Sequence, residues 1–411
     1  MKSLRKVAII DCGGLSILPS GLQFCTALRE LQLWNCPLVT SISVGGLSSL
    51  QNLSVFACPL LTSIDGLGDC TSLESLNLSD CPLLGSIPII QGMPFLRSLK
   101  IRGCGGLSIL PSGLNCCTSL QELSVSDCPL VTSIPIIQGM PSLRQLEIAC
   151  AGLSSLPSGL RFCTSLEELS IQGGCFRELP LPSISCTRVL RRLTIRGCCE
   201  LTSISMSSHP ESEEESFPSL LVLRIEDCTS LESIIPADLQ GFTCLRELTI
   251  QKCGKLKYLP TGLHCLTRLE AVNVGGLWEE LDSFPDLQLP PKLFLYKLAL
   301  YGWPKLKCLP QIHHLTCLTR LEIYNFGGLE SLPDWLGNFE YLEALNLIKC
   351  ENLKYLPTLE AMQRLTNLKT LYIWRCPLLE ERCISNGPEW PKISHIGVQT
   401  RPSWFVEEDS S

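Results

Sequence analysis

The stretch LRELQLWNCPLVTSI, residues 28–42, decides the fold. In its first part Leu31 and Leu33 alternate with polar residues, which is the pattern of a short strand with one buried face. After Cys36 the apolar residues recur at every third position as far as Ile42, a spacing that suits a tight coil turning inward. The stretch therefore predicts one turn of a coil whose leucines point to a shared interior.

This pattern, LxxLxI followed by xxCxxLxxLP, returns along the whole chain. One unit cannot bury its own leucines, but stacked units can. The sixteen units begin at Leu4, Leu28, Leu50, Leu73, Leu96, Leu120, Leu143, Leu166, Leu190, Leu220, Leu245, Leu269, Leu295, Leu318, Leu342 and Leu368, and a degenerate seventeenth follows at Ile393, Ile396 and Val398. We expect an α/β leucine-rich-repeat solenoid, a horseshoe of about 16 repeats with a parallel sheet on its concave side. Residues 1–392 should form this solenoid, and residues 393–411 a degenerate last repeat and tail.

The composition favours a folded scaffold and excludes several other classes. Of the 411 residues 45% are hydrophobic and only 18% are charged, so a large core can form. The net charge of −7 argues against a general binder of nucleic acid or membrane surfaces. The sequence has no apolar run near the ~18 residues of a membrane helix and no signal peptide at its start, so we expect the cytoplasm or nucleus.

The 25 cysteines follow the repeat and not the spacing of a metal site. No CxxC pair occurs, and cysteines one repeat apart are best explained as small buried apolar residues. We expect reduced, buried thiols. One frame position holds Cys12, Cys36, Cys58, Cys81, Cys104, Cys128, Cys198, Cys228, Cys253, Cys350 and Cys376, and the return segments hold Cys25, Cys70, Cys117 and Cys163.

Catalytic signals are missing from the sequence. None of the five histidines stands with a nucleophile or a paired carboxylate in a recognisable motif, and neither GxxxxGK[ST] nor GxGxxG occurs. We therefore expect a protein that is not an enzyme and needs no cofactor.

The residue after the last apolar strand position should point out of the concave face. At the C-terminal end this row reads Tyr301, Tyr324, Ile348 and Trp374, with Arg320, Lys349 and Arg375 flanking it. Aromatic residues beside arginine are enriched at interface centres, which predicts a partner-binding wall. The alternative is that cross-strand aromatic pairs only stabilise the sheet.

At the N-terminal end the same row reads Ile10, Trp34 and Phe56. Met1 stands at the first strand with no polar cap before it, so this apolar row lies beside an open end of the core. Exposed apolar patches of this kind usually meet a partner. We expect a domain-docking surface here.

Two further features concern charge. The unit starting at Leu190 contains an acidic insertion, residues 209–216, which is either a solvated loop or a docking site for a basic partner.

The segments Cys81–Ile101 and Cys128–Ile148 differ at only five of 21 positions, and one difference replaces Lys100 by Glu147 on the expected strand surface. A scaffold with an adjustable surface allows such a change.

The unit LxxLxIxxCxxLxxLP, with Cys where many leucine-rich repeats have Asn, resembles the repeat domain of plant intracellular disease-resistance proteins of the nucleotide-binding, leucine-rich-repeat class. The ending Cys376-Pro377-Leu378-Leu379-Glu380, with Arg382-Cys383, Gly387, Trp390, Lys392-Ile393 and His395-Ile396, is similar to the end of many coiled-coil members. The resemblance implies contact with a pathogen effector or a guarded host protein, and autoinhibition of a nucleotide-binding switch domain. Motifs of that domain are missing from this sequence, so nucleotide binding is not carried over.

Two other functions fit a cysteine-containing repeat solenoid. One is the substrate-receptor subunit of a ubiquitin ligase, although no F-box helices precede Leu4. The other is a Leu-Pro-rich signalling scaffold that binds small GTPases. Sequence upstream of the repeats would separate the three.

Overall fold

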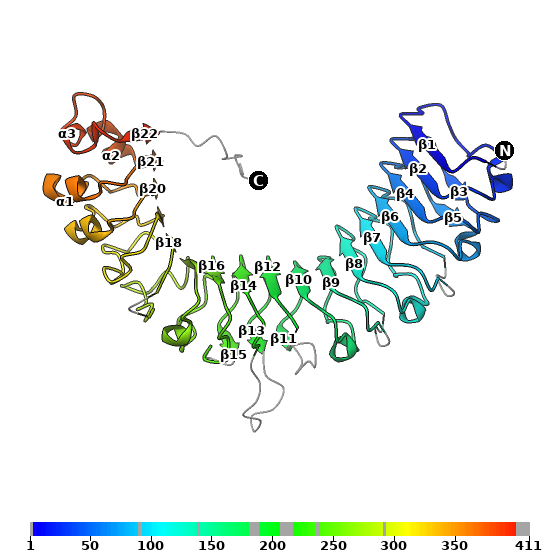
Figure 1. Ribbon diagram of the computed structural model, residues 1–411, viewed down its shortest axis with the longest axis horizontal. Coiled ribbons are helices and arrows are strands. Elements are labelled where there is room, and N and C mark those ends of the chain that lie inside the picture. The colour runs from blue at the N-terminus through cyan, green and yellow to red at the C-terminus, as the bar shows by residue number, and fades with distance from the viewer. Residues whose placement is uncertain are drawn as a thin grey trace, which may run out of the picture. The chain divides into compact units, whose positions relative to one another are not determined.

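The computed structural model describes residues 3–88, 93–135, 137, 140–180, 189–205, 217–235, 239–290 and 293–399. The chain divides into two compact units, Met1–Leu220 and Leu221–Ser411, here called unit 1 and unit 2. Each is a coil in which every turn contributes one strand to a parallel sheet (Figure 1).

The main sheet of unit 1 pairs neighbouring strands in parallel and in register, so that Leu31 lies opposite Leu53 and Leu53 opposite Leu76. Its strands are β1 (Lys6–Ile10), β2 (Glu30–Trp34), β4 (Asn52–Phe56), β6 (Ser75–Ser79), β7 (Ser98–Arg102), β8 (Glu122–Ser126), β9 (Gln145–Ala149), β10 (Glu168–Gln172) and β12 (Arg192–Arg196).

The main sheet of unit 2 follows the same rule. Its strands are β14 (Val222–Glu226), β16 (Glu247–Gln251), β17 (Ala271–Gly275), β18 (Lys297–Tyr301), β19 (Arg320–Tyr324), β20 (Ala344–Ile348), β21 (Thr370–Trp374) and β22 (Gly397–Gln399). Every strand expected from an LxxLxI unit is present in one of the two sheets, and β22 lies at the degenerate seventeenth unit. The expected parallel-strand solenoid is confirmed.

Short helices and short second strands make the return from one strand to the next. The 3-10 helices are Leu22–Phe24, Leu67–Asp69, Leu114–Cys116 and Leu160–Phe162 in unit 1, and Leu263–Cys265 and Asp334–Asn338 in unit 2. Unit 2 also has α1 (Leu359–Arg364), α2 (Pro377–Arg382) and α3 (Trp390–Ile393). The second strands are β3 (Ser41–Ser43), β5 (Ser63–Asp65), β11 (Glu178–Pro180), β13 (Ser203–Ser205) and β15 (Ser233–Ile235). No helix in the described ranges has the length and apolar character needed to cross a bilayer.

The core lies between the strands and the returns of each turn. The second and fourth residues of a strand point inward, as Leu31 and Leu33 do in β2, where both are fully buried. Each such leucine contributes roughly 2 kcal/mol by leaving water. The first, third and fifth residues point outward and form what we call the strand face.

The cysteine prediction is confirmed for the frame position, where Cys36, Cys58, Cys81 and their equivalents are buried; Cys12, in the first turn, is partly exposed. A buried thiol donates to the carbonyl oxygen two residues before it, for example from Cys81 Sγ to Ser79 O at 3.4 Å. It therefore satisfies a carbonyl at the end of the strand. Burial raises the pKa of Cys81 to about 12, so this thiol stays protonated.

Candidate functional site

The strand face ends at a residue with a left-handed backbone. The residue just after the fifth strand position has a φ of 52° at Asn35, 56° at Asp80, 55° at Lys349 and 54° at Arg375. Asn and Asp adopt this conformation readily, but Lys and Arg do so at a cost of about 1 kcal/mol. The bend turns the chain from the sheet toward the buried cysteine.

The sequence-predicted wall in unit 2 contains a close aromatic pair. We call Tyr301, Tyr324, Trp374, Arg320, Lys349 and Arg375 the C-terminal wall. Tyr301 and Tyr324 are opposite each other in β18 and β19, and their rings stack 4.4 Å apart at an angle of 4°. Both rings are half-buried. Stacked rings anchored to neighbouring strands form a rigid aromatic surface.

A buried carboxylate, which the repeat pattern did not predict, holds this pair. Glu322, the third residue of β19, is only 5% exposed. It accepts a hydrogen bond from Tyr324 Oη at 2.9 Å and another from Asn346 Nδ2 at 3.5 Å. Burial, together with the charge of Glu322, raises the pKa of Tyr301 to about 12 and also raises that of Tyr324.

Two basic side chains also reach Glu322. Lys297 Nζ lies 3.6 Å from one carboxylate oxygen and Arg320 Nη1 lies 3.9 Å from the other. Arg320 is the first residue of β19, four positions before Tyr324, so it supports the wall through Glu322 and does not flank the rings directly.

The end of the wall at β21 combines an aromatic ring with a cation. The Arg375 guanidinium lies 4.5 Å above the centre of the Trp374 ring, a cation–π contact. Lys349 follows Ile348 and is exposed. Ile348, which the sequence places in the same outward row, is only 2% exposed. The wall is thus a stacked tyrosine pair and a separate Trp-Arg pair.

The N-terminal row has the geometry expected from the sequence. Ile10, Trp34 and Phe56 lie opposite one another on β1, β2 and β4, and Ile10 and Trp34 are each 54% exposed. The rings of Trp34 and Phe56 stack 4.9 Å apart. This row is more exposed than the tyrosine pair of the wall.

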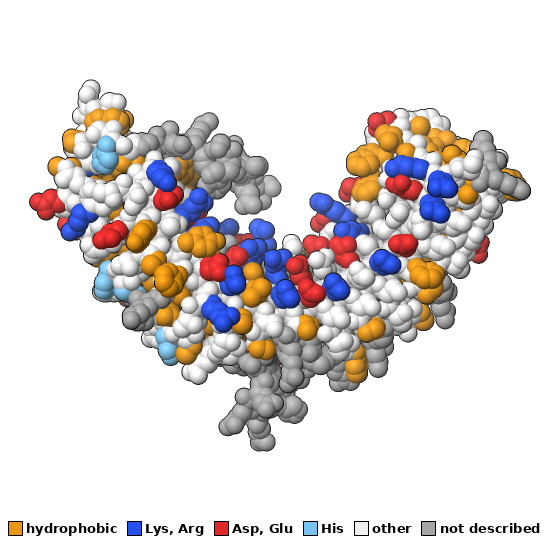
Figure 2. All heavy atoms as spheres, in the orientation of Figure 1, with side chains coloured by type: hydrophobic (Ala, Val, Ile, Leu, Met, Phe, Trp, Pro, Cys, Tyr) orange, Lys and Arg blue, Asp and Glu red, His pale blue; other side chains and the backbone are white. Residues whose placement is uncertain are grey.

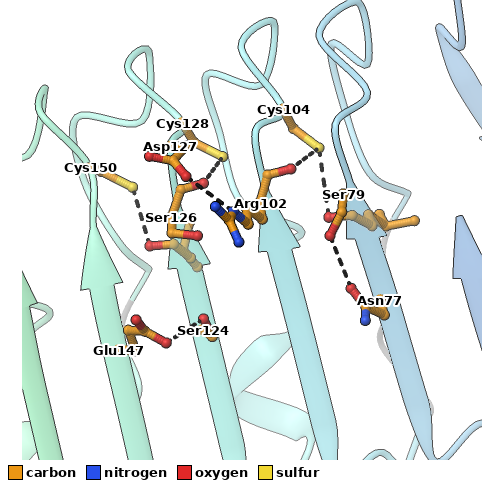
Figure 3. Close-up of polar contacts among 12 residues, drawn as sticks. Asn77, Ser79, Arg102, Cys104, Ser124, Ser126, Asp127, Cys128, Glu147 and Cys150 are labelled. Carbon is orange, nitrogen blue, oxygen red and sulfur yellow. Dashed lines mark hydrogen bonds and ion pairs between the residues drawn. The ribbon is translucent and has the colours of Figure 1, made fainter. Parts of the chain in front are cut away.

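The middle of the strand face in unit 1 is polar. Acidic and basic side chains lie intermingled there (Figure 2), and ion pairs join neighbouring strands, as between Lys100 and Glu122 at 2.7 Å. Two depressions of about 400 and 250 Å³ lie on this face. Ser124 and Glu147 line both depressions, and Figure 3 shows these two side chains below the buried thiols of Cys128 and Cys150.

The acidic insertion, residues 209–216, lies outside the described residues. Within the described part of the chain, no group of three or more His, Cys, Asp or Glu side chains is arranged to hold a metal ion.

Comparison with known proteins agrees with this architecture. The sequence model of the R13L1/DRL21 leucine-rich repeats matches residues 316–376, and the general leucine-rich-repeat model matches residues 72–92. A leucine-rich-repeat protein of Leptospira interrogans superposes with a TM-score of 0.61 at 19% identity, covering 97% of this chain and 96% of that one. This likeness shows the fold alone. The chain therefore has the leucine-rich-repeat fold.

Proteins with similar sequences indicate the type of leucine-rich repeat. A disease-resistance protein of Arabidopsis thaliana, At4g19050, is 28% identical over an alignment of 257 residues that covers 54% of this chain and 20% of that protein. The Arabidopsis disease resistance protein RPP4 is 27% identical over 199 residues, 48% of this chain and 16% of its own length. The repeats of this chain are of the type found in plant disease-resistance proteins, as the sequence predicted. The matched region spans about a fifth or less of these relatives.

Proposed function

We propose that this chain is the recognition part of a plant immune receptor and binds a pathogen effector or a guarded host protein through the C-terminal wall. The observation that carries the proposal is the pair of rigid aromatic groups, Tyr301 with Tyr324 and Trp374 with Arg375, on the strand face of unit 2. Rigid aromatic side chains lose little entropy on binding and dominate many interfaces.

The charge of the wall supports this role. Lys349 and Arg375 are exposed and make no ion pair with another described residue. Both occupy a left-handed backbone position where Asn or Gly would fit better. A cation held at such a position, next to an aromatic ring, suits contact with a protein partner.

Partner labelling in plant leaf cells tests the wall. The chain, fused to a proximity-labelling enzyme, would be compared with its Trp374→Ala variant and with Trp34→Ala, a change in the N-terminal row that tests the alternative surface. We expect Trp374→Ala to lower labelling of the specific partner at least tenfold, because truncating a central interface aromatic commonly costs about 2 kcal/mol or more. Its melting temperature should stay within about 2 °C of the wild type, because the leucine core is untouched.

Two outcomes would refute the proposal that the C-terminal wall binds the partner. Loss of labelling with Trp34→Ala, but not with Trp374→Ala, would assign recognition to the N-terminal row. Unfolding of Trp374→Ala several degrees earlier would mean that the aromatic groups only stabilise the sheet.

The second part of the proposal concerns regulation. In a receptor of this kind, Ile10, Trp34 and Phe56 dock a nucleotide-binding switch domain and hold it inactive in the cytoplasm or nucleus. Ile10, Trp34 and Phe56 lie next to one another on neighbouring strands, and a contiguous exposed apolar patch often marks an interaction site, which supports this role. Added to the receptor that contains these repeats, the double variant Trp34→Ala and Phe56→Ala should activate cell death without effector. An unchanged, silent receptor would contradict the docking role.

A further inference from the structure

Unit 1 carries a second candidate surface, separate from the C-terminal wall and from the N-terminal row. The two depressions of about 400 and 250 Å³ lie on its strand face, across β6 to β12. They adjoin, because Glu122, Ser124 and Glu147 line both. A chain segment lying on this face would contact both depressions at once.

Six of the seven charged side chains that line the depressions neutralise one another. Lys100 pairs with Glu122 at 2.7 Å, Arg102 with Asp127 at 3.3 Å and Arg192 with Glu168 at 2.9 Å. The second of these pairs is drawn in Figure 3. The seventh charged residue is Glu147.

Glu147, on β9, is the lining carboxylate that these three ion pairs do not include. It is half-buried, accepts a hydrogen bond from Ser124 Oγ at 2.9 Å, and forms no ion pair with any described residue. Its second carboxylate oxygen accepts no hydrogen bond from the described part of the chain. A half-buried carboxylate in this position favours an incoming cation, which would gain more here than at a fully hydrated site.

The near-identical repeat shows that this charge is not required by the fold. Lys100 occupies the position of Glu147 in the matching segment, and the backbones on either side form the same strand with the same buried leucines. Lys100 has an acidic partner within the protein, whereas Glu147 has no basic one. The same strand position can therefore carry a positive or a negative charge. At Glu147 the described residues provide no positively charged partner.

We propose that the strand face over β7 to β12 binds a protein segment that presents an arginine or lysine side chain to Glu147. Arginine fits best, because its planar fork can pair with a carboxylate while it donates to neighbouring oxygens. The three basic residues that line the depressions are all paired with acidic residues, so an acidic segment would meet no unpaired cation among them. A metal ion would find too few ligands among the described residues.

The test uses the full chain and two peptide pools. Each pool holds 12-residue peptides with randomised uncharged residues around one fixed central residue, which is arginine in one pool and citrulline, its uncharged equivalent, in the other. Fluorescence anisotropy measures binding. We expect the arginine pool to bind about tenfold more tightly than the citrulline pool, which is the gain typical of one partly shielded charge-assisted pair.

Three variants sharpen the result. Glu147→Gln should remove the preference for arginine, and so should Glu147→Lys, which copies the residue of the sister repeat and should therefore fold. Glu351→Gln, an exposed carboxylate of unit 2, should change nothing. Equal binding of both pools, or an arginine preference that survives Glu147→Gln, would overturn the proposal.

This test is independent of the proposed wall. Trp374→Ala should leave binding of the arginine pool unchanged, because no residue of the wall lines the depressions. A negative result with the peptide pools would therefore not contradict the proposed role of the C-terminal wall. A negative result in the partner-labelling experiment would likewise not contradict the proposed role of this surface.

Discussion

The strand faces of the two units differ although their frameworks are the same. In unit 1 the third residues of the strands, such as Lys100, Ser124 and Glu147, are partly exposed. In unit 2 several of the equivalent residues are buried, namely Thr249, Ala299, Glu322, Asn346 and Tyr372. Register and inward leucines are equivalent in both units, whereas the outward side chains differ in size and charge. An outward direction therefore does not guarantee an exposed surface.

The largest expected effect tests whether the two cores are in fact equivalent. Leu123→Ala in unit 1 and Leu321→Ala in unit 2 each remove a fully buried side chain from the same strand position. We expect each to lower the local free energy of unfolding by about 3 kcal/mol, because each leaves a cavity. Hydrogen exchange of peptides covering β8 and β19 measures both. A loss in one unit less than half that in the other would break the equivalence.

The next effect separates the two faces. Glu322→Ala should lower the stability of unit 2 by about 2 kcal/mol or more, because it leaves the Lys297 charge and the Tyr324 hydroxyl without their buried acceptor. Glu147→Ala in unit 1 should change stability by less than about 0.5 kcal/mol, as is usual at a partly exposed position. Chemical denaturation followed by hydrogen exchange compares them. Similar losses would mean that Glu147 is as enclosed as Glu322.

A pH titration measures the enclosed face directly. The pKa of Tyr301 lies at about 12 in the folded chain and that of Tyr324 is also raised, whereas an unfolded tyrosine titrates near about 10. The folded state thus favours the neutral phenols. Their contribution to stability is fully present below about pH 10 and is lost as the pH rises from about 10 toward 12.

Absorbance of tyrosinate follows this titration. We expect a late component near pH 12 that disappears in the double variant Tyr301→Phe and Tyr324→Phe. If the double variant keeps the late component, the stacked pair is not its source.

The smallest expected effect concerns the left-handed position after each strand. Lys349→Asn should raise the stability of unit 2 by at most about 1 kcal/mol, because Asn adopts a φ of 55° more readily than Lys. The same change should weaken partner binding if Lys349 belongs to the recognition surface. Asp80 in unit 1, with a φ of 56°, is already a suitable residue, so Asp80→Asn is a neutral control. Lower stability of Lys349→Asn would show that the lysine makes a stabilising contact.

The sequence predicted the framework closely and the surface only in part. Alternating Leu31 and Leu33, followed by Cys36, placed a strand and a buried thiol correctly. The same reasoning placed Ile348 in the outward row between Tyr324 and Trp374, and the structure buries it. The predicted outward direction of this side chain was therefore correct, but its predicted exposure was wrong. The proposed roles of Tyr301, Trp374 and the N-terminal row remain predictions.

By itself the sequence determined the repeat, the strand positions, the register and the core. These depend on patterns within about 24 residues, and stacking identical turns leaves only one way to bury their leucines. Only the tertiary structure decided which outward residues are enclosed. Glu322 is buried because Lys297, Arg320 and Asn346 reach it from its own and neighbouring strands, and Glu147 lacks a cation because the basic residues around it pair with other acids. Contacts of this kind depend on side-chain size and charge in adjacent turns, which no periodicity along the chain records.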